Sequence, residues 1–376
     1  MTKFAILFFS IFLRLILFCF IYMILEKITL VKHMEKKKIS STNLIIIFFI
    51  SYSFYTIQIL SQHLFYLYSK EAVFLTSIMF TLMPIVAYIT CKIINKNKLN
   101  NNIKCNFLYK SISSIYLLIT LIISLIYITN LIYIYYYPET LLLIILFFLS
   151  LPLIYTIIKG DYIFYYLASF LLIITIIFKY VYTKHLPDID MFTFYNFFKV
   201  SKNHILPLIL LILPLLLEPL LLITSQKDIE NKINIKLVLI LSISLSLVGI
   251  TTNLRQLFEF GTLLDKIRFP YLESIKNIVA GDFFENVDYY YLLSIAFSIY
   301  ARIGYSIITI KRSFNLNKIV SICLIFAVII IVYFAEKSMK LYENALESLL
   351  LTCSICLIIA LLTLPFMIKR RKKANV

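Results

Sequence analysis

The stretch HILPLILLILPLLLEPLLLITSQ, from His204 to Gln226, is long enough to cross a lipid bilayer as a helix. It contains Pro207, Pro214 and Pro219, and a single acid, Glu218, directly before the last of them. Each proline lacks a backbone donor and strains the helical turn before it. Broken helices at membrane depth line binding sites, and an ionisable group there is costly unless it has a partner. We predict a break over 213–220, with Glu218 directed at a ligand, an ion or a polar partner. The alternative is a kinked structural helix whose acid lies near the interface or pairs with a neighbour.

The composition is that of a membrane protein. The chain has 376 residues, of which 61% are hydrophobic, and a mean hydropathy of +0.93. The apolar residues form blocks of about 17 to 25, the length of membrane-spanning helices rather than of outer-membrane strands. The fold class is therefore an all-α polytopic membrane protein. The net charge of +17 does not indicate nucleic acid, because the basic residues gather in short loops and at the C-terminus, where topology explains them.

Ten spans are expected after an N-terminal hydrophobic extension. Residues 4–25 are apolar but interrupted by Arg14, and no small-residue cleavage site follows, so we expect residues 1–33 to form an extra helix and not a signal peptide. Residues 34–376 are expected to form one membrane domain. Its predicted spans are 43–62, 72–91, 112–134, 140–158, 163–181, 204–224, 235–252, 289–310, 318–335 and 346–367.

The loops between these spans alternate in charge. Basic clusters such as Lys36 to Lys38 and Lys369 to Lys373 fall on one side, while most acids fall on the other, among them Asp188 and Glu273. By the positive-inside rule, both ends of the ten-span core are cytoplasmic. Ten spans with both ends on one side divide into five plus five of opposite orientation, which is the arithmetic of an inverted repeat.

In such a repeat the proline-broken span opens the second half, and its counterpart is 43–62. A polar interruption lies there, made of Ser51, Tyr52, Ser53, Tyr55, Thr56 and Gln58. Two odd segments in corresponding positions indicate a site near the membrane midplane. The alternative is that these side chains only pack between helices. The predicted ligand-binding residues are Glu218, Tyr52, Ser53, Tyr55, Thr56, Pro214, Pro219 and Arg302.

Two further features are open to more than one interpretation. The segment 253–288 has apolar residues at helical spacing with charges between them, which predicts one or two amphipathic helices in an outer loop. It would serve as a lid, a docking surface or a scaffold.

Arg302 lies a few turns before Lys311, so we expect it to snorkel toward the interface. The alternatives are that it pairs with Glu218 or binds a carboxylate. Gly304 would allow a close helix approach there.

Nothing in the sequence indicates an enzyme or a cofactor. It contains no Gly-rich phosphate loop, no H-E-x-x-H and no G-x-S-x-G. Its four histidines are far apart in the chain. Cys353 and Cys356 form a C-x-x-C inside an apolar span without histidine partners, so packing residues are a better interpretation than a metal or redox site. We expect no catalysis, no cofactor and no metal.

Several segments resemble one known family. They are KKISSTNLIIIFFIS at 37–51, SKEAVFL at 69–75, IIKGDYIFYY at 157–166, PLLLEPLLL at 214–222 and, as the most specific block, FPYLESIKNIVAGDFFENVDYYYLL at 269–293. Together they are similar to the spore-germination permease-like proteins, the B-type membrane subunits of nutrient germinant receptors, which are related to the amino acid–polyamine–organocation transporters. The resemblance covers about residues 36 to 370, and Glu218 falls where the family commonly has a glutamate.

The resemblance implies a ten-helix, LeuT-like inverted-repeat fold in the spore inner membrane, with an A-type membrane subunit and a C-type lipoprotein as partners. The role it implies is recognition of a small nutrient, typically an amino acid, that helps trigger germination. A zwitterion would bind between spans one and six, with Glu218 attracting its ammonium group. Two other functions are kept open: a secondary transporter of amino acids or cations, and a structural receptor subunit without a ligand of its own.

Overall fold

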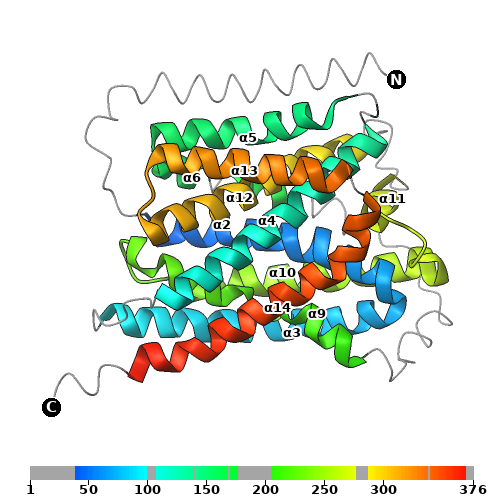
Figure 1. The fold of residues 1–376 in the computed structure, drawn as a ribbon. Helices are drawn as coiled ribbons and strands as arrows, with labels where there is room; N and C mark the ends of the chain where they lie inside the picture. The colour runs from blue at the N-terminus through cyan, green and yellow to red at the C-terminus, as the bar shows by residue number, and fades with distance from the viewer. Residues whose placement is uncertain are drawn as a thin grey trace. The chain divides into compact units, whose positions relative to one another are not determined.

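A computed structural model describes residues 39–99, 107–136, 138, 140–167, 170–176, 205–276, 287–337 and 339–369. The N-terminal extension expected at residues 1–33 lies outside this part of the chain. The regular elements of the described residues are all helical (Figure 1). They are α2 (Ser41–Ser53), η2 (Phe54–Leu60), α3 (Ser61–Leu99), α4 (Phe107–Tyr135), α5 (Leu142–Lys159), α6 (Asp161–Tyr166), α9 (Ile205–Leu217), η4 (Glu218–Asp228), α10 (Ile235–Phe260), η5 (Gly261–Leu263), α11 (Pro270–Lys276), α12 (Val287–Phe314), α13 (Lys318–Lys337) and α14 (Met339–Lys369).

Within this part of the chain, 8 helical runs are long and apolar enough to cross a membrane, and they correspond to nine of the ten expected spans. The run Ser41–Lys96 holds the first two spans. They meet at Ser69, where a φ of 49° and a ψ of −128° turn the chain inside α3. The fifth span contains α6 and the helical residues 170–176, and its expected end at 181 lies outside the description.

Glycine separates or ends two of these helices. Gly160 lies between α5 and α6 with a φ of 138°, and Gly261 ends α10 with a φ of 50°. Residues that carry a side chain rarely adopt such positive φ angles. Glycine adopts them at little cost, so the chain can turn at these two positions. The start of α10 is capped by Asn234, whose side chain accepts hydrogen bonds from the backbone of Lys236 and Leu237.

Three spans form the centre of the bundle. The share of the membrane-length window that is buried is 72% in α4, 78% in the α9–η4 span and 83% in α12, compared with 28% in α13. α12 packs against α2, α4 and η4, whereas α13 lies beside α5 at the edge (Figure 1). Polar groups on the central spans are therefore shielded from lipid and must find partners within the protein.

The start of the first span and the end of the sixth span meet at one end of the bundle. Ile39 forms an isolated parallel bridge with Ile229, with Ile39 N donating to Asp228 O at 2.7 Å and Glu230 N donating to Ile39 O at 2.9 Å. At the end of α12, Lys311 and Arg312 pair with Asp161 at 2.6 and 3.2 Å. These contacts tie the first, fifth, sixth and eighth spans together.

The segment expected as an outer loop from residue 253 begins later than predicted. α10 continues to Phe260, and Asn253, Arg255 and Gln256 are buried. The helix continues because these polar side chains have partners in α3 and α11: Asn253 bonds Thr76, and Gln256 bonds Gln62. After Gly261 come η5 and the short helix α11, and residues 277–286 lie outside the description.

Candidate functional site

The sixth span is broken at the glutamate. The α-helix α9 ends at Leu217, and the 3₁₀-helix η4 begins at Glu218, so the structure confirms a discontinuity within the predicted range. In an α-helix, the backbone N–H of residue 219 would bond the carbonyl of Leu215, but Pro219 has no N–H. The hydroxyl of Tyr52 donates to that carbonyl instead. A side chain of the first half thus satisfies an acceptor that the proline leaves open in the second half.

Two tyrosines of α4 hold the same break. Tyr109 donates to the carbonyl of Leu220 at 2.7 Å, and Tyr116 donates to Glu218 Oε2 at 2.7 Å. They lie about two turns apart, so they project from one face of α4. Both are fully buried. They were not among the predicted site residues, although two tyrosines at this spacing in an apolar helix are a usable signal.

The first span has a different irregularity. Residues Phe54–Leu60 form the π-helix η2, and all seven are buried. The hydroxyls of Ser53 and Thr56 donate to the backbone oxygens of Ile50 and Tyr52, at 2.9 and 2.8 Å. A polar interruption is therefore present where the sequence indicated one. It is a widened helix with its own hydroxyl bonds, rather than a segment opened by glycine or proline.

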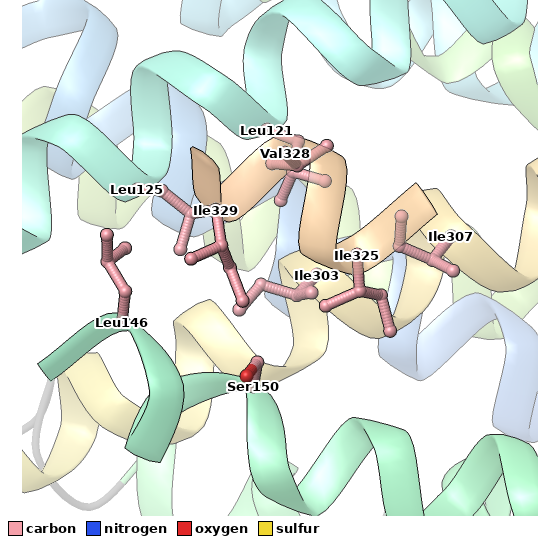
Figure 2. Close-up of a pocket in the computed structure, with 9 residues that line it drawn as sticks. All are labelled: Leu121, Leu125, Leu146, Ser150, Ile303, Ile307, Ile325, Val328 and Ile329. Carbon is pink, nitrogen blue, oxygen red and sulfur yellow. The ribbon is translucent and has the colours of Figure 1, made fainter. Parts of the chain in front are cut away.

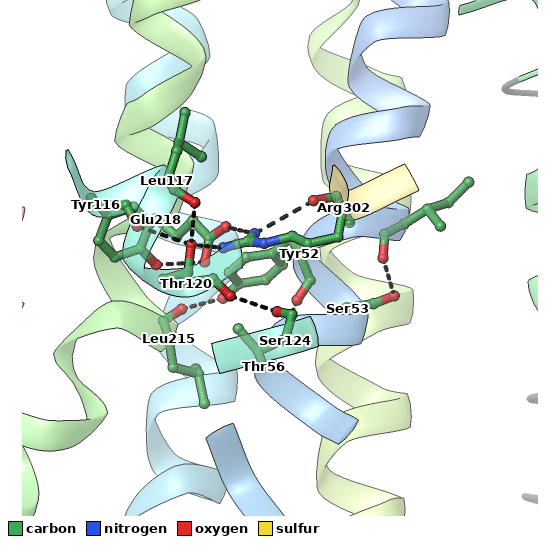
Figure 3. A network of polar contacts seen from close by, with 12 residues as sticks. Tyr52, Ser53, Thr56, Tyr116, Leu117, Thr120, Ser124, Leu215, Glu218 and Arg302 are labelled. Carbon is green, nitrogen blue, oxygen red and sulfur yellow. Dashed lines mark hydrogen bonds and ion pairs between the residues drawn. The ribbon is translucent and has the colours of Figure 1, made fainter. Parts of the chain in front are cut away.

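Arg302 of α12 reaches Glu218, and both side chains are 0% exposed. Arg302 Nη1 pairs with Glu218 Oε1, and Nη2 donates to the hydroxyl of Thr120 (Figure 3). The Thr120 hydroxyl is free to accept because its proton goes to backbone oxygens of α4. The prediction that Arg302 snorkels is wrong. At the centre of the bundle, the Glu218 carboxylate neutralises the charge of the Arg302 guanidinium, so the side chain does not have to extend to the membrane interface.

The first span completes the surroundings of the guanidinium. The hydroxyl of Ser51 accepts from Nη1 at 3.4 Å, and the Tyr55 ring lies 4.6 Å from the guanidinium carbon. An aromatic face at this distance attracts a cation. Among the described residues, Nε of Arg302 has no hydrogen-bond partner. One donor of the buried arginine therefore remains available.

The structure brings five of the eight predicted site residues to one place: Glu218, Pro219, Arg302, Tyr52 and Tyr55. Ser53 and Thr56 lie beside them, with their hydroxyls committed to their own helix. Pro214 lies buried inside α9, about one turn before Glu218.

A small cavity is lined by Ile303, the residue that follows Arg302 in α12 (Figure 2). Its volume is about 10 Å³, room for about one water molecule. It lies between α4, α5, α12 and α13 and is apolar except for Ser150.

Within the described ranges, no group of three or more His, Cys, Asp or Glu side chains is placed to hold a metal ion. Cys353 is buried and Cys356 half-buried, and both are free thiols.

Comparisons with known proteins support the fold. No protein-family model matches the sequence, and no curated protein matches it significantly. Solved structures of the Eremococcus coleocola manganese transporter do match. A histidine-to-alanine variant of it has a TM-score of 0.50 at 12% sequence identity, covering 86% of this chain and 76% of that one. The same transporter bound to an aromatic bis-isothiourea substituted compound has a TM-score of 0.49, with the same identity and coverage.

At this identity the likeness establishes the fold. The chain is an integral, multi-pass, all-α membrane protein built as a ten-span inverted-repeat bundle of the LeuT-like kind. The irregular segments of its first and sixth spans meet at a buried Glu218–Arg302 pair.

Proposed function

We propose that this protein recognises a small zwitterionic nutrient, an amino acid, at the Glu218–Arg302 pair. The observation that carries the proposal is a fully buried ion pair between two irregular helical segments. A zwitterion brings an ammonium group for Glu218 and a carboxylate for Arg302, so it can replace each partner without leaving a net charge in the membrane. A simple cation or anion would leave one charge unpaired, at a cost of several kcal/mol.

The surrounding groups suit such a ligand. Arg302 has an uncommitted Nε donor for a carboxylate, and the Tyr55 ring can lie against a cationic or apolar group. Binding would separate Arg302 from Glu218 and favour a different packing of the bundle. In the role we propose, that change is the signal.

The biological setting we propose is the membrane subunit of a spore germinant receptor, acting with an A-type subunit and a C-type lipoprotein in the spore inner membrane. The support is the resemblance over residues 36 to 370, including the blocks at 214–222 and 269–293. Within assembled receptors, Glu218→Gln should abolish the response of spores to their nutrient. An unchanged response would exclude the site from sensing.

Ligand recognition can be tested directly on the purified full-length chain. Each common amino acid is added separately, and the midpoint of thermal unfolding is measured. A ligand at 100 times its Kd stabilises the folded state by about 2.7 kcal/mol. We expect at least one amino acid to raise the midpoint, and Glu218→Gln and Arg302→Gln to remove the rise.

Glu347→Gln is the matched control. Glu347 is exposed and accepts a bond from Tyr68 at 2.7 Å, so it is an acid of another helix outside the site. Amino acids should raise the unfolding midpoint of the Glu347→Gln variant as much as that of the natural chain. No stabilisation by any amino acid would contradict the proposal and favour a structural subunit without its own ligand.

A second candidate function is secondary transport, which the shared fold with a transporter favours. Uptake of labelled amino acid into vesicles that contain this chain alone would show it. The matched transporter carries manganese according to its description. We expect no manganese uptake through the Glu218 site, because the Arg302 guanidinium beside it opposes a divalent cation.

A further inference from the structure

Gln62 is a buried amide at the start of α3, 1% exposed, directly after the π-helix η2. Its Nε2 donates to Gln256 Oε1 of α10 at 3.0 Å and, more weakly, to the carbonyl of Ile57 in η2 at 3.4 Å. Its Oε1 accepts from the backbone N–H of Tyr271 in α11 at 2.9 Å. One side chain therefore joins the π-helix, the end of α10 and the first turn of α11.

The direction of these bonds is fixed by chemistry. A backbone N–H can only donate, so Tyr271 places the oxygen of the Gln62 amide toward α11 and its nitrogen toward Gln256. Gln256 must then present its oxygen to Gln62, which leaves its own Nε2 without a partner among the described residues. Gln58 Oε1, about one turn before Gln62, also lacks one there. Buried polar atoms without partners are costly, so this seam does not satisfy all its polar groups in the present arrangement.

α11 is also held by the neighbouring residue of α10. Arg255 Nε donates to the Ser274 hydroxyl at 2.9 Å, and Nη2 donates to the Ser274 carbonyl at 3.3 Å. Gln62 therefore anchors the first turn of α11, and Arg255 anchors the turn that follows. Both anchors depend on the position of α11 relative to α10 and η2.

The π-helix links this anchor to the ion pair. Tyr55 belongs to η2, and its ring lies 4.6 Å from the guanidinium carbon of Arg302. A π-helix closes its bonds one residue later than an α-helix. Tightening it by one residue would rotate the following residues by about 100° and shift them by about 1.5 Å along the axis. Either movement carries the Gln62 amide away from Tyr271 N.

We propose that Gln62 couples occupancy of the Glu218–Arg302 site to the docking of α11. A ligand that draws Arg302 away from Tyr55 lets η2 tighten, and α11 then separates from α10 and α3. This coupling rests on the proposed function for its ligand, while the mechanical link itself is tested without one.

The test is hydrogen exchange of Pro270–Lys276 in the full-length protein in lipid nanodiscs. Gln62→Met keeps the length of the side chain and removes its bonds, so we expect exchange in this segment to accelerate about tenfold, the effect of losing one buried hydrogen bond. Asn95→Leu is the matched control. Asn95 also bonds a backbone N–H and C=O, those of Ile233 at 2.8 and 2.9 Å, but at the other end of α10. Unchanged exchange in Gln62→Met would overturn the coupling.

Deletion of Ile59 tests the π-helix itself. Removing one residue lets η2 become α-helical while Gln62 keeps its register, so α11 stays protected but no longer responds to ligand. The probe is a mixture of the common amino acids added to natural and deletion proteins. If the mixture raises the unfolding midpoint of the natural chain and α11 exchange does not change, the coupling is wrong and the proposed function stands. If Gln62→Met releases α11 but no amino acid binds, the proposed function fails, and only the attachment of α11 through Gln62 stands.

Discussion

The two irregular segments, η2 in the first half and the α9–η4 junction in the second, occupy corresponding positions and are built differently. The second is tightened into a 3₁₀-helix, begins at an acid and is created by a proline. The first is widened into a π-helix with neither proline nor glycine. The tight segment leaves carbonyls that need outside donors, and α2, the helix that leads into the wide segment, supplies one of those donors, Tyr52.

This difference indicates that η2 and the α9–η4 junction have separate roles. The junction at Glu218 holds a fixed charge and depends on α4, α12 and the first span for its partners. The π-helix holds the aromatic face beside Arg302 and connects to α11 through Gln62. One segment therefore presents the charge, and the other, in the coupling we propose, changes its register in response to what binds there.

The largest expected effect comes from breaking the charge pair. Arg302→Met leaves the Glu218 carboxylate buried without its partner, so the free energy of unfolding should fall by about 3–5 kcal/mol. The double variant with Glu218→Gln removes both charges and should recover most of that loss, because the Tyr116 bond can persist. Denaturant unfolding in micelles measures both variants. A loss below about 1 kcal/mol in the single variant would show that the pair is solvated like a surface pair.

Next comes the position of α12, which contacts both irregular segments. A Cβ at Gly304 would overlap the Phe164 ring, so Gly304→Ala should cost about 1–3 kcal/mol through overpacking. Adding Phe164→Leu makes room and should restore part of the stability. If Gly304→Ala is neutral, α12 has freedom to shift, and Arg302 is not held by close packing.

The donor that links the two segments gives an effect of similar or smaller size. Tyr52→Phe leaves the Leu215 carbonyl unsatisfied and should cost about 1–3 kcal/mol. In a Pro219→Ala background the cost should fall, because the restored N–H at position 219 can bond that carbonyl. Tyr109→Phe is the control, since its acceptor is Leu220 and its cost should not depend on residue 219. Equal costs in the two backgrounds would disprove the compensation.

The smallest effects should distinguish the hydroxyls around the guanidinium. Thr120→Val removes a direct acceptor of α4 and should cost about 1 kcal/mol, whereas Ser51→Ala removes a bond at 3.4 Å and should cost about 0.5 kcal/mol or less. Unfolding of the two variants under identical conditions gives the comparison. The reverse order would mean that the first span, rather than α4, holds Arg302 in place.

Local sequence signals predicted part of this arrangement. Hydropathy placed nine of the ten spans on described membrane-length helices, and the pair Glu218–Pro219 placed the break within one turn of where it occurs. The polar residues at 51–58 indicated a departure from regular helix but not its kind, because a π-helix without glycine or proline has no distinctive sequence. The partner of Arg302 was misjudged, since snorkelling is the usual solution for an arginine near the end of a span.

The sequence by itself determined that the chain crosses a membrane repeatedly, and it predicted a break of the sixth span near Glu218 and Pro219. Both follow from local physics: the cost of apolar surface in water, and a proline without a donor. The tertiary structure alone decided that Glu218 meets Arg302, that Tyr52 satisfies Leu215, and that Gln62 reaches α11. Those pairs are separated by 84, 163 and 209 residues along the chain. Contacts over such separations depend on how the helices pack, which no local pattern encodes.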